Sequence, residues 1–308
     1  MDVRRIWDQS PYSAFPDLIR YQDRWLCVFR EGIAHAGDCG TLRLIVSDDG
    51  DNWHSLSQLF SESCDLRDGK LSITPQGQLM LNTGELCDSA AGRNLRSLSY
   101  FSDDGVQWQG PFEIGDPNFW LWRTEWHNQV AYSIGYGKER FVRLYRSEDG
   151  KQFTTLIDSL YDENGPNESA LLFRDDGSCL CLLRRDNIKG KGGDNGLLGI
   201  ATPPYTKWQW RDIGCRIGGP EMVALPDGSV VAAVRKYHFN SEGKYESEWL
   251  ELCWVDDKNG AFETIMTLPS GGDCGYAGMV WHEGLLWVSY YSSHEERPSI
   301  YLARVGLT

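Results

Sequence analysis

The chain has 308 residues, a formal net charge of −14 and 41% hydrophobic residues. This excess of acidic groups disfavours nucleic acids and anionic membrane surfaces as partners. No stretch approaches 18 consecutive apolar residues, so the sequence predicts no membrane-spanning segment. The first residues, Met1 to Trp7, lack the apolar core of a signal peptide, and we expect a cytoplasmic protein.

The sequence contains nine cysteines. Cys27, Cys179, Cys181 and Cys253 lie in apolar, strand-like runs, where buried free thiols are common. No pair of cysteines has the Cys-x-x-Cys spacing of a zinc site, so no metal centre is predicted. We therefore expect reduced thiols that fill the core of an intracellular protein.

Six units, each a strand, a tight turn and a second strand, follow one another along the chain. Their turns are predicted at Gln22-Asp23, Gln76-Gly77, His127-Asn128, Asp176-Gly177, Asp227-Gly228 and Glu283-Gly284. Each unit continues with further strands, and a repeat of about 50 residues is typical of propellers. No linker divides the chain, so residues 1–308 are predicted to form one domain.

The sixth unit ends after three strands, at Ile300–Val305, while an unassigned strand-like run, Val3–Trp7, opens the chain. Pairing of this run with the sixth unit would close the ring and remove an exposed sheet edge. The predicted fold is therefore an all-β, six-bladed β-propeller with four-stranded antiparallel blades.

One turn motif occurs three times, at Ser47–Trp53, Ser102–Trp108 and Ser147–Phe153. Each copy reads Ser-x-Asp-Gly-x-x-aromatic. The Ser and Asp side chains can bond backbone amides, and Gly can adopt a positive φ, so the motif predicts a closed turn between outer strands. Residues 202–208 and 256–262 occupy the same place in units four and five as degenerate copies.

Three arginines hold the same position, seven residues after the hairpin turn, in units one, four and five. They are Arg30, Arg184 and Arg235, and each ends an apolar run. A charge at the end of a buried strand needs an opposite charge. Either each arginine pairs with a blade carboxylate, or all three converge on the axis and bind an anion; their equivalence favours an anion site.

Polar residues also begin the first strands of several units. Glu168 heads an apolar strand in unit four, and Tyr276 lies between small residues in unit six. A Tyr hydroxyl beside a carboxylate can lose its proton as it attacks a substrate. The alternatives are a core aromatic for Tyr276 and an ion pair for Glu168.

These motifs resemble those of the sialidase superfamily, whose propellers carry the repeated turn known as the Asp-box. The resemblance covers nearly the whole chain and implies a Tyr nucleophile, Tyr276, with Glu168 as its partner. It implies Asp38, in a Gly-rich loop, as the acid/base; a simple turn residue is the alternative. It also implies arginines that bind a sugar carboxylate. Ala14 stands where the family has an arginine in its first blade, which leaves the exact acidic sugar open.

Five other polar residues are predicted at the same end of the propeller as substrate-binding candidates: His35, Arg67, Asp68, Glu125 and His294. Arg67 with Asp68 can instead form a pair within one blade. His294 can instead be a surface-loop residue, or act as an acid or base near neutral pH.

The sequence thus predicts a retaining exo-glycosidase that acts on a terminal acidic sugar, with an acidic glycan or glycoside as its partner. A polysaccharide lyase acting on uronates and a non-catalytic glycan-binding propeller are the alternatives. No cofactor is predicted, because the Gly-rich segment 189–196 lacks the spacing of a phosphate-binding loop. The sequence does not indicate an oligomeric state.

Overall fold

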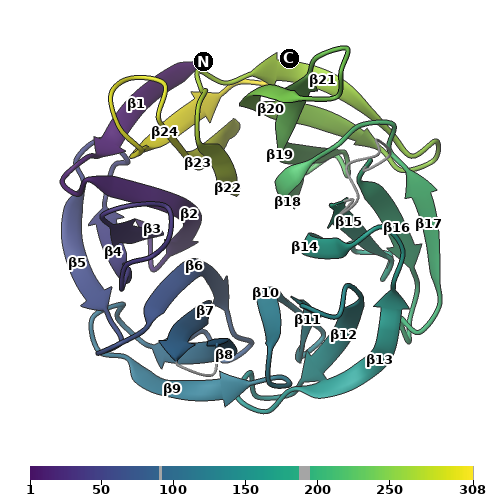
Figure 1. The fold of residues 1–308 in the computed structure, drawn as a ribbon, viewed down its shortest axis with the longest axis horizontal. Coiled ribbons are helices and arrows are strands. Elements are labelled where there is room, and N and C mark those ends of the chain that lie inside the picture. The colour runs from purple at the N-terminus through teal and green to yellow at the C-terminus, as the bar shows by residue number, and fades with distance from the viewer. Residues whose placement is uncertain (90–91, 187–194, 308) are drawn as a thin grey trace.

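The computed structural model describes residues 1–89, 92–186 and 195–307. These residues form 24 strands in six four-stranded antiparallel sheets, arranged as a ring around an axis (Figure 1). The predicted six-bladed propeller is confirmed. Positions 189–194 of the Gly-rich segment lie outside the described residues.

The first three blades each use four consecutive strands, numbered outward from the axis. Blade 1 contains β2 (Tyr12–Tyr21), β3 (Arg24–Gly32), β4 (Thr41–Ser47) and β5 (His54–Leu59). Blade 2 contains β6 (Asp65–Ile73), β7 (Leu79–Ser89), β8 (Gly92–Ser102) and β9 (Gln109–Ile114). Blade 3 contains β10 (Phe119–His127), β11 (Val130–Gly137), β12 (Val142–Ser147) and β13 (Thr154–Tyr161).

The next two blades repeat this order. Blade 4 contains β14 (Pro166–Phe173), β15 (Cys179–Arg185), β16 (Leu197–Ala201) and β17 (Trp208–Asp212). Blade 5 contains β18 (Gly218–Ala224), β19 (Val230–Phe239), β20 (Tyr245–Asp256) and β21 (Ala261–Thr267). The innermost strands β2, β6, β10, β14 and β18 surround the axis together with β22 (Figure 1).

Blade 6 combines both ends of the chain. Its strands are β22 (Cys274–His282), β23 (Leu285–Ser292), β24 (Ser299–Val305) and β1 (Asp2–Trp7). Strand β1 runs antiparallel to β24, with Asp2 opposite Arg304, and the two lie side by side in Figure 1. The predicted closure by the N-terminal strand is confirmed.

The three Ser-x-Asp-Gly turns are closed as predicted. In the first copy, Asp49 Oδ1 accepts hydrogen bonds from the amides of Asp51 (2.8 Å) and Asn52 (2.9 Å). The Gly50 amide donates to Ser47 Oγ (2.8 Å), and its φ of +76° is a conformation that favours glycine. The turns at residues 102–108 and 147–153 repeat this pattern, so these motifs have a structural role.

Each innermost strand carries a two-residue irregularity in its pairing with the next strand, close to the start of the blade. A bulge of this kind re-aims side chains locally. The irregular positions include Asp68, Glu168, Gly219 and Tyr276. Three of these, Asp68, Gly219 and Tyr276, have φ values near +50°. The repeated bulge therefore presents polar groups toward the axis from different blades.

The expectation of nine reduced cysteines is wrong for two of them. Cys64, just before β6, forms a disulfide with Cys87 in β7. The two residues are 23 apart in the sequence and meet because β6 and β7 are paired strands. The described residues contain one group of three potential metal ligands, Cys64, Glu85 and Cys87, in which the two sulfurs are already bonded to each other.

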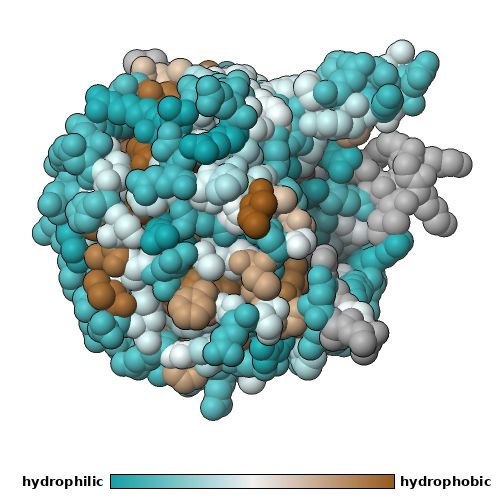
Figure 2. Space-filling view, turned by 60° about the vertical axis from the view of Figure 1, so that its left-hand side comes forward, coloured by the Kyte–Doolittle hydropathy of each residue, from teal (hydrophilic) through white to brown (hydrophobic). Residues whose placement is uncertain are grey.

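The face of the molecule in Figure 2 is mainly hydrophilic, with apolar side chains in small separate groups. The described part of the chain forms no helix with the length and hydropathy that crossing a membrane requires.

Candidate functional site

Tyr276 and Glu168 meet across the axis, from blades 6 and 4. The Tyr276 hydroxyl donates to Glu168 Oε1 at 2.5 Å, and both residues are buried. The expected contact between them is therefore present. Each side chain comes from the bulge of its own innermost strand, so the two are brought together by the ring rather than by the local sequence.

The second oxygen of Glu168 is held by the protein. Glu168 Oε2 accepts hydrogen bonds from Arg184 Nη1 and from the Gly219 amide, both at 2.8 Å. Arg184 Nη1 also lies 3.3 Å from the Tyr276 hydroxyl. With Oε2 occupied, Glu168 presents Oε1 to Tyr276, which is the orientation that a base accepting the Tyr proton requires.

The electrostatic surroundings keep Tyr276 neutral at rest. Burial and the nearby Glu168 carboxylate raise its pKa well above the usual value, although Arg184 and Arg235 act in the opposite direction. Ionisation of Tyr276 is therefore costly. Nucleophilic attack by Tyr276 therefore requires that its proton pass to Glu168 during the reaction.

Gly219 makes the close approach of blades 5 and 6 possible. A Cβ atom at this position would lie 2.9 Å from Tyr276 Cγ, and the φ of Gly219 is +52°. We expect Gly219→Ala to push the Tyr276 ring away from Glu168 and to lower kcat/KM by on the order of 10²-fold, since a shift of about 1 Å has this effect in other enzymes. Steady-state kinetics on a substrate of the protein would measure it.

Gly228→Ala is the matched control for this prediction, because Gly228 also has a positive φ but a Cβ there would meet nothing within 4 Å. The same strain should lower stability in both variants, while only Gly219→Ala should lower kcat/KM. Equal kcat/KM in the two variants would show that the close packing of Gly219 against the Tyr276 ring is not needed for the reaction.

Arg235 also packs against Tyr276. Its guanidinium lies 4.8 Å from the centre of the Tyr276 ring, and its Nη2 donates to the Tyr291 hydroxyl at 2.8 Å. Its Nε donates to the Cys274 carbonyl at 2.5 Å. Arg184 and Arg235 therefore converge on Tyr276, as predicted from their equivalent positions.

Arg30 does not join them, so the predicted convergence of three arginines is wrong for this residue. Its guanidinium is fully buried beneath the loop that follows β3. It donates to Asp65 Oδ1 (2.7 Å), Asp38 Oδ1 (2.8 Å) and the Ala34 carbonyl (2.9 Å). With these partners, Arg30 fastens the loop to blade 2 instead of facing the axis.

Both carboxylate oxygens of Asp38, the acid predicted from the sequence, are bound by other groups of the protein. Its Oδ2 accepts from the Ile33 amide at 2.6 Å, while Oδ1 is bound to Arg30. Burial opposes ionisation, but the bonds from Ile33 and Arg30 outweigh it and lower the pKa of Asp38. Asp38 lines a cavity of about 120 Å³ together with Asp65 and Arg67. A carboxyl group with a lowered pKa is ionised at neutral pH and has no proton to give to a leaving group.

Arg67 takes the place near the axis that was expected for Arg30. Its guanidinium lies 5.0 Å from the centre of the Phe15 ring, and the Phe15 ring packs against Tyr276 with 5.2 Å between centroids. The Arg67 Nε has no hydrogen-bond partner within the described residues. One cation with an unused donor therefore lies one aromatic ring away from the Tyr276–Glu168 pair.

Asp68, the next residue in the same strand, is also buried. Its Oδ2 accepts from Trp122 Nε1 at 3.1 Å, and the Trp122 ring packs edge-on against Tyr276 at 5.8 Å. Burial raises the pKa of Asp68, despite the opposing charges of Arg67 and Lys70. Asp68 therefore belongs to the wall of the Tyr276 site.

Glu125 was predicted at the same end of the propeller, but it lies three residues beyond Trp122 toward the hairpin turn of blade 3. There it lines a different cavity, of about 240 Å³, with Asp17, Arg123 and Glu221. Its predicted role in binding the substrate at the Tyr276 site is not supported by this placement. Burial raises the pKa of Glu125 to about 8, with repulsion from Glu221 and Asp17 adding to the effect.

This raised pKa predicts how stability varies with pH. The folded state keeps the Glu125 proton up to about pH 8, whereas the unfolded chain releases it near the ordinary value of 4.5. Folding therefore loses stability as the pH rises through this window. We expect Glu125→Gln to reduce the difference in unfolding free energy between pH 5 and pH 8, measured by denaturant titration.

The exposed residue Glu113 supplies the control, because Glu113→Gln should leave that pH difference as it is in the wild type. If the Glu125→Gln variant shows the same change in unfolding free energy between pH 5 and pH 8 as the wild type, Glu125 is ionised in the folded protein.

His294 lies in the loop after β23. Among the described residues, it contacts Ser292, whose Oγ is 2.9 Å from its Nδ1, and Tyr301, rather than the Tyr276–Glu168 pair. His35, in contrast, lies near the pair: its ring packs against Phe15 with 5.2 Å between centroids.

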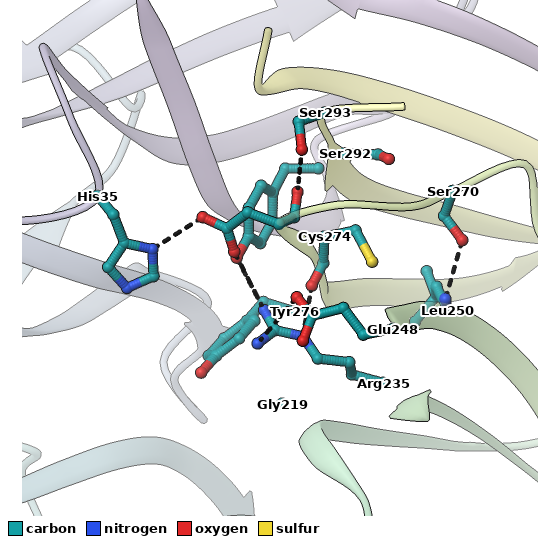
Figure 3. A network of polar contacts seen from close by, with 12 residues as sticks. His35, Gly219, Arg235, Glu248, Leu250, Ser270, Cys274, Tyr276, Ser292 and Ser293 are labelled. Atoms are coloured by element: carbon teal, nitrogen blue, oxygen red, sulfur yellow. Dashed lines mark hydrogen bonds and ion pairs between the residues drawn. The ribbon is translucent and has the colours of Figure 1, made fainter. Parts of the chain in front are cut away.

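The structure contains a polar network around Asp273 that we did not predict from the sequence. Asp273 Oδ2 accepts from the Tyr12 hydroxyl and lies 2.8 Å from His35 Nδ1, while Oδ1 accepts from Tyr291 at 2.6 Å. Figure 3 shows His35, Arg235 and Tyr276 around one region, coming from three blades. The available signal was the segment Gly271-Gly272-Asp273, which places an acid just before an innermost strand.

Burial alone would favour the neutral form of Asp273, but hydrogen bonds from His35, Tyr12 and Tyr291 lower its pKa to about 2. Asp273 is therefore an anion at neutral pH. It joins the loop of blade 1 to blade 6, and through Tyr291 to Arg235 of blade 5.

No known protein-family model matches the chain, and no curated protein matches its sequence. Solved structures match its fold. A Dyadobacter fermentans protein of unknown function has a TM-score of 0.82 and 17% identity, over 99% of both chains. An α-L-arabinanase of Penicillium chrysogenum, complexed with arabinobiose, has a TM-score of 0.73 and 13% identity, over 99% of this chain and 98% of that chain.

The sialidase of Trypanosoma rangeli has a TM-score of 0.69 and 14% identity, over 96% of this chain and 55% of that chain. The present propeller thus corresponds to about half of the sialidase and to nearly the whole arabinanase. The chain has the six-bladed β-propeller fold that the sialidase-like superfamily and these arabinanases share.

Proposed function

We propose that the protein is a retaining glycoside hydrolase that releases a terminal sugar carrying a carboxylate from a glycan. The observation that carries this proposal is the 2.5 Å hydrogen bond from Tyr276 to a Glu168 carboxylate whose other oxygen is already held. A tyrosine paired with a base in this way is equipped for nucleophilic attack. The fold shared with sialidases and arabinanases agrees with a glycosidase.

In the first step, the Tyr276 oxygen attacks the anomeric carbon while its proton passes to Glu168. A glycosyl–tyrosine bond forms and the bond to the leaving group breaks. Water then attacks the same carbon, the tyrosine leaves, and Glu168 returns the proton. Two displacements give net retention of configuration. A neutral nucleophile also avoids repulsion when a carboxylate lies next to the anomeric carbon.

Arg67, Arg184 and Arg235 are the groups that would bind this carboxylate. Arg184 and Arg235 contact Tyr276, and the Arg67 guanidinium lies against the Phe15 ring that packs on Tyr276. A charged hydrogen bond to a carboxylate is roughly twice as strong as a neutral one. These cations favour an acidic sugar over a neutral one.

A second candidate is a hydrolase that releases a neutral arabinose unit. Two observations favour it: the arabinanase matches over nearly its whole length, and buried Ala14 occupies the place of the first-blade arginine of sialidases. The choice between the two depends on whether the arginines bind a substrate anion or only position Tyr276 and Glu168.

The test is a panel of aryl glycosides of sialic acids, other ulosonic acids, uronic acids and arabinose, together with 4-linked uronate oligosaccharides, with product analysis by mass and by proton NMR. Release of an acidic sugar with retained configuration supports the proposal. Release of arabinose alone supports the second candidate. An unsaturated product that absorbs in the ultraviolet indicates a lyase, and binding without any product indicates a glycan-binding propeller.

A further inference from the structure

The retaining reaction also needs a group that protonates the leaving oxygen, and the structure offers a better one than Asp38. Both oxygens of Asp38 are occupied by Arg30 and by the Ile33 amide. Three residues earlier in the same loop, His35 extends from the fold with a side chain that is 54% exposed.

His35 is held at one ring nitrogen only. Its Nδ1 lies 2.8 Å from Asp273 Oδ2, and the Tyr12 hydroxyl lies 2.7 Å from the same nitrogen. Its Nε2 has no bond to any of the residues that the structure describes. A carboxylate at Nδ1 fixes the orientation of an imidazole and directs the other nitrogen outward, where it can exchange protons with a ligand.

The His35 ring and the nucleophile share one packing partner. The rings of His35 and Tyr276 both pack edge-on against Phe15, each with 5.2 Å between centroids. One aromatic ring therefore separates them. In retaining glycosidases the proton donor and the nucleophile lie on either side of the scissile bond. His35 and Tyr276, which both border Phe15, are the two side chains that this arrangement offers for these roles.

We infer that His35, oriented by Asp273, is the general acid and base of the reaction, and that Asp38 and Arg30 only hold its loop in place. This inference rests on the proposed function. In the first step, His35 Nε2 gives its proton to the leaving glycosidic oxygen as the carbon–oxygen bond breaks. In the second step, neutral His35 takes a proton from the attacking water, so that the enzyme returns to its starting state.

The ion pair of His35 with Asp273 also joins blade 1 to blade 6, so a purely structural role must be distinguished from a chemical one. His35→Asn makes this distinction, since the Asn amide can still donate to Asp273 from the position of Nδ1 but has no group at Nε2. We expect the loop of this variant to stay in place but to lack a proton donor.

The readout is the dependence of kcat on the leaving group. For a substrate with a poor leaving group, such as a disaccharide, we expect His35→Asn to lower kcat by on the order of 10²- to 10⁴-fold. For a nitrophenyl glycoside of the same sugar, whose leaving group needs no protonation, the loss in the first step should be less than about tenfold. His238→Asn, which alters an exposed His–Glu pair in blade 5, should match the wild type on both substrates.

Equal losses on both substrates, or no loss on either, would overturn the role of His35. A leaving-group-dependent loss in Asp38→Asn instead would assign the acid to Asp38. Failure of the proposed function is seen separately, in a wild-type protein that hydrolyses neither substrate, and the inference then fails with it.

Discussion

Replacing Tyr276 by Phe should abolish turnover while leaving the fold intact. The variant loses only the hydroxyl that donates to Glu168 at 2.5 Å, whereas the ring contacts with Phe15 and Trp122 remain. Removal of a nucleophile lowers kcat by on the order of 10³- to 10⁶-fold in other enzymes. Steady-state kinetics on the best substrate of the glycoside panel would measure the loss, and circular dichroism would check the fold.

Tyr290→Phe is the matched control for this variant. Tyr290 is also buried in blade 6, but its hydroxyl donates to the Pro269 carbonyl and not to a group of the site. It should lose some stability and retain turnover. Full activity of Tyr276→Phe would remove the tyrosine from the chemistry and leave a carboxylate such as Glu168 as the better nucleophile.

Replacing Arg123 by Met should destabilise the protein by about 3–5 kcal/mol, the usual effect of removing one partner from a buried ion pair. Arg123 donates to Asp17 (3.1 Å) and to the Ala277 carbonyl (2.8 Å), and its Nε lies 2.5 Å from Glu221. Three other blades, 1, 5 and 6, therefore contact the guanidinium of Arg123, which comes from blade 3. Without it, the two buried carboxylates keep only Lys70 as a nearby positive group among the described residues.

Urea unfolding would measure this loss as a lower unfolding free energy, with Arg4→Met as the control. Arg4 is half exposed and pairs with Asp2 and Asp51, so its removal should change stability by less than about 1 kcal/mol. Similar losses of unfolding free energy in the two variants would mean that the network around Arg123 stabilises the protein no more than a surface ion pair does.

The architecture was predictable because every blade repeats the same local signals. Hairpin turns such as Gln22-Asp23 and the Ser-x-Asp-Gly turns are fixed by contacts within a few residues, which the sequence displays directly. The closure by β1 followed from a count of strands, since the sixth unit lacked one. These conclusions needed no knowledge of which side chains meet across the axis.

The Tyr276–Glu168 pair was predictable because both residues begin innermost strands, at similar heights on the axis, and because the resemblance to the sialidase superfamily implies that they are partners. The same reasoning was wrong for Arg30, because the height of a residue along the axis does not determine the direction in which its side chain points. Asp65, from the neighbouring blade, and Asp38, from the following loop, turn the Arg30 guanidinium away from the axis. Contacts between different blades decide that direction, and a single sequence does not display them.

Asp273 was missed because its partners are far away in the sequence. Tyr12 and His35 belong to the first blade and Asp273 to the last, so they meet only after the ring has closed. The disulfide of Cys64 and Cys87 was missed for a similar reason, since its formation depends on the register between β6 and β7. Both features depend on which strands and blades pair with each other, and the amino-acid composition does not reveal this.

The antiparallel pairing of β1 with β24 has a consequence for folding kinetics. Asp2 and Arg304, which are partners in this sheet, are separated by almost the whole chain. Blades 1 to 5 use neighbouring strands and can form early, whereas the last sheet requires a very long loop to close, which lowers the folding rate. The Asp273 network joins the same two blades, so the side chains around Tyr276 should be among the last to reach their final arrangement.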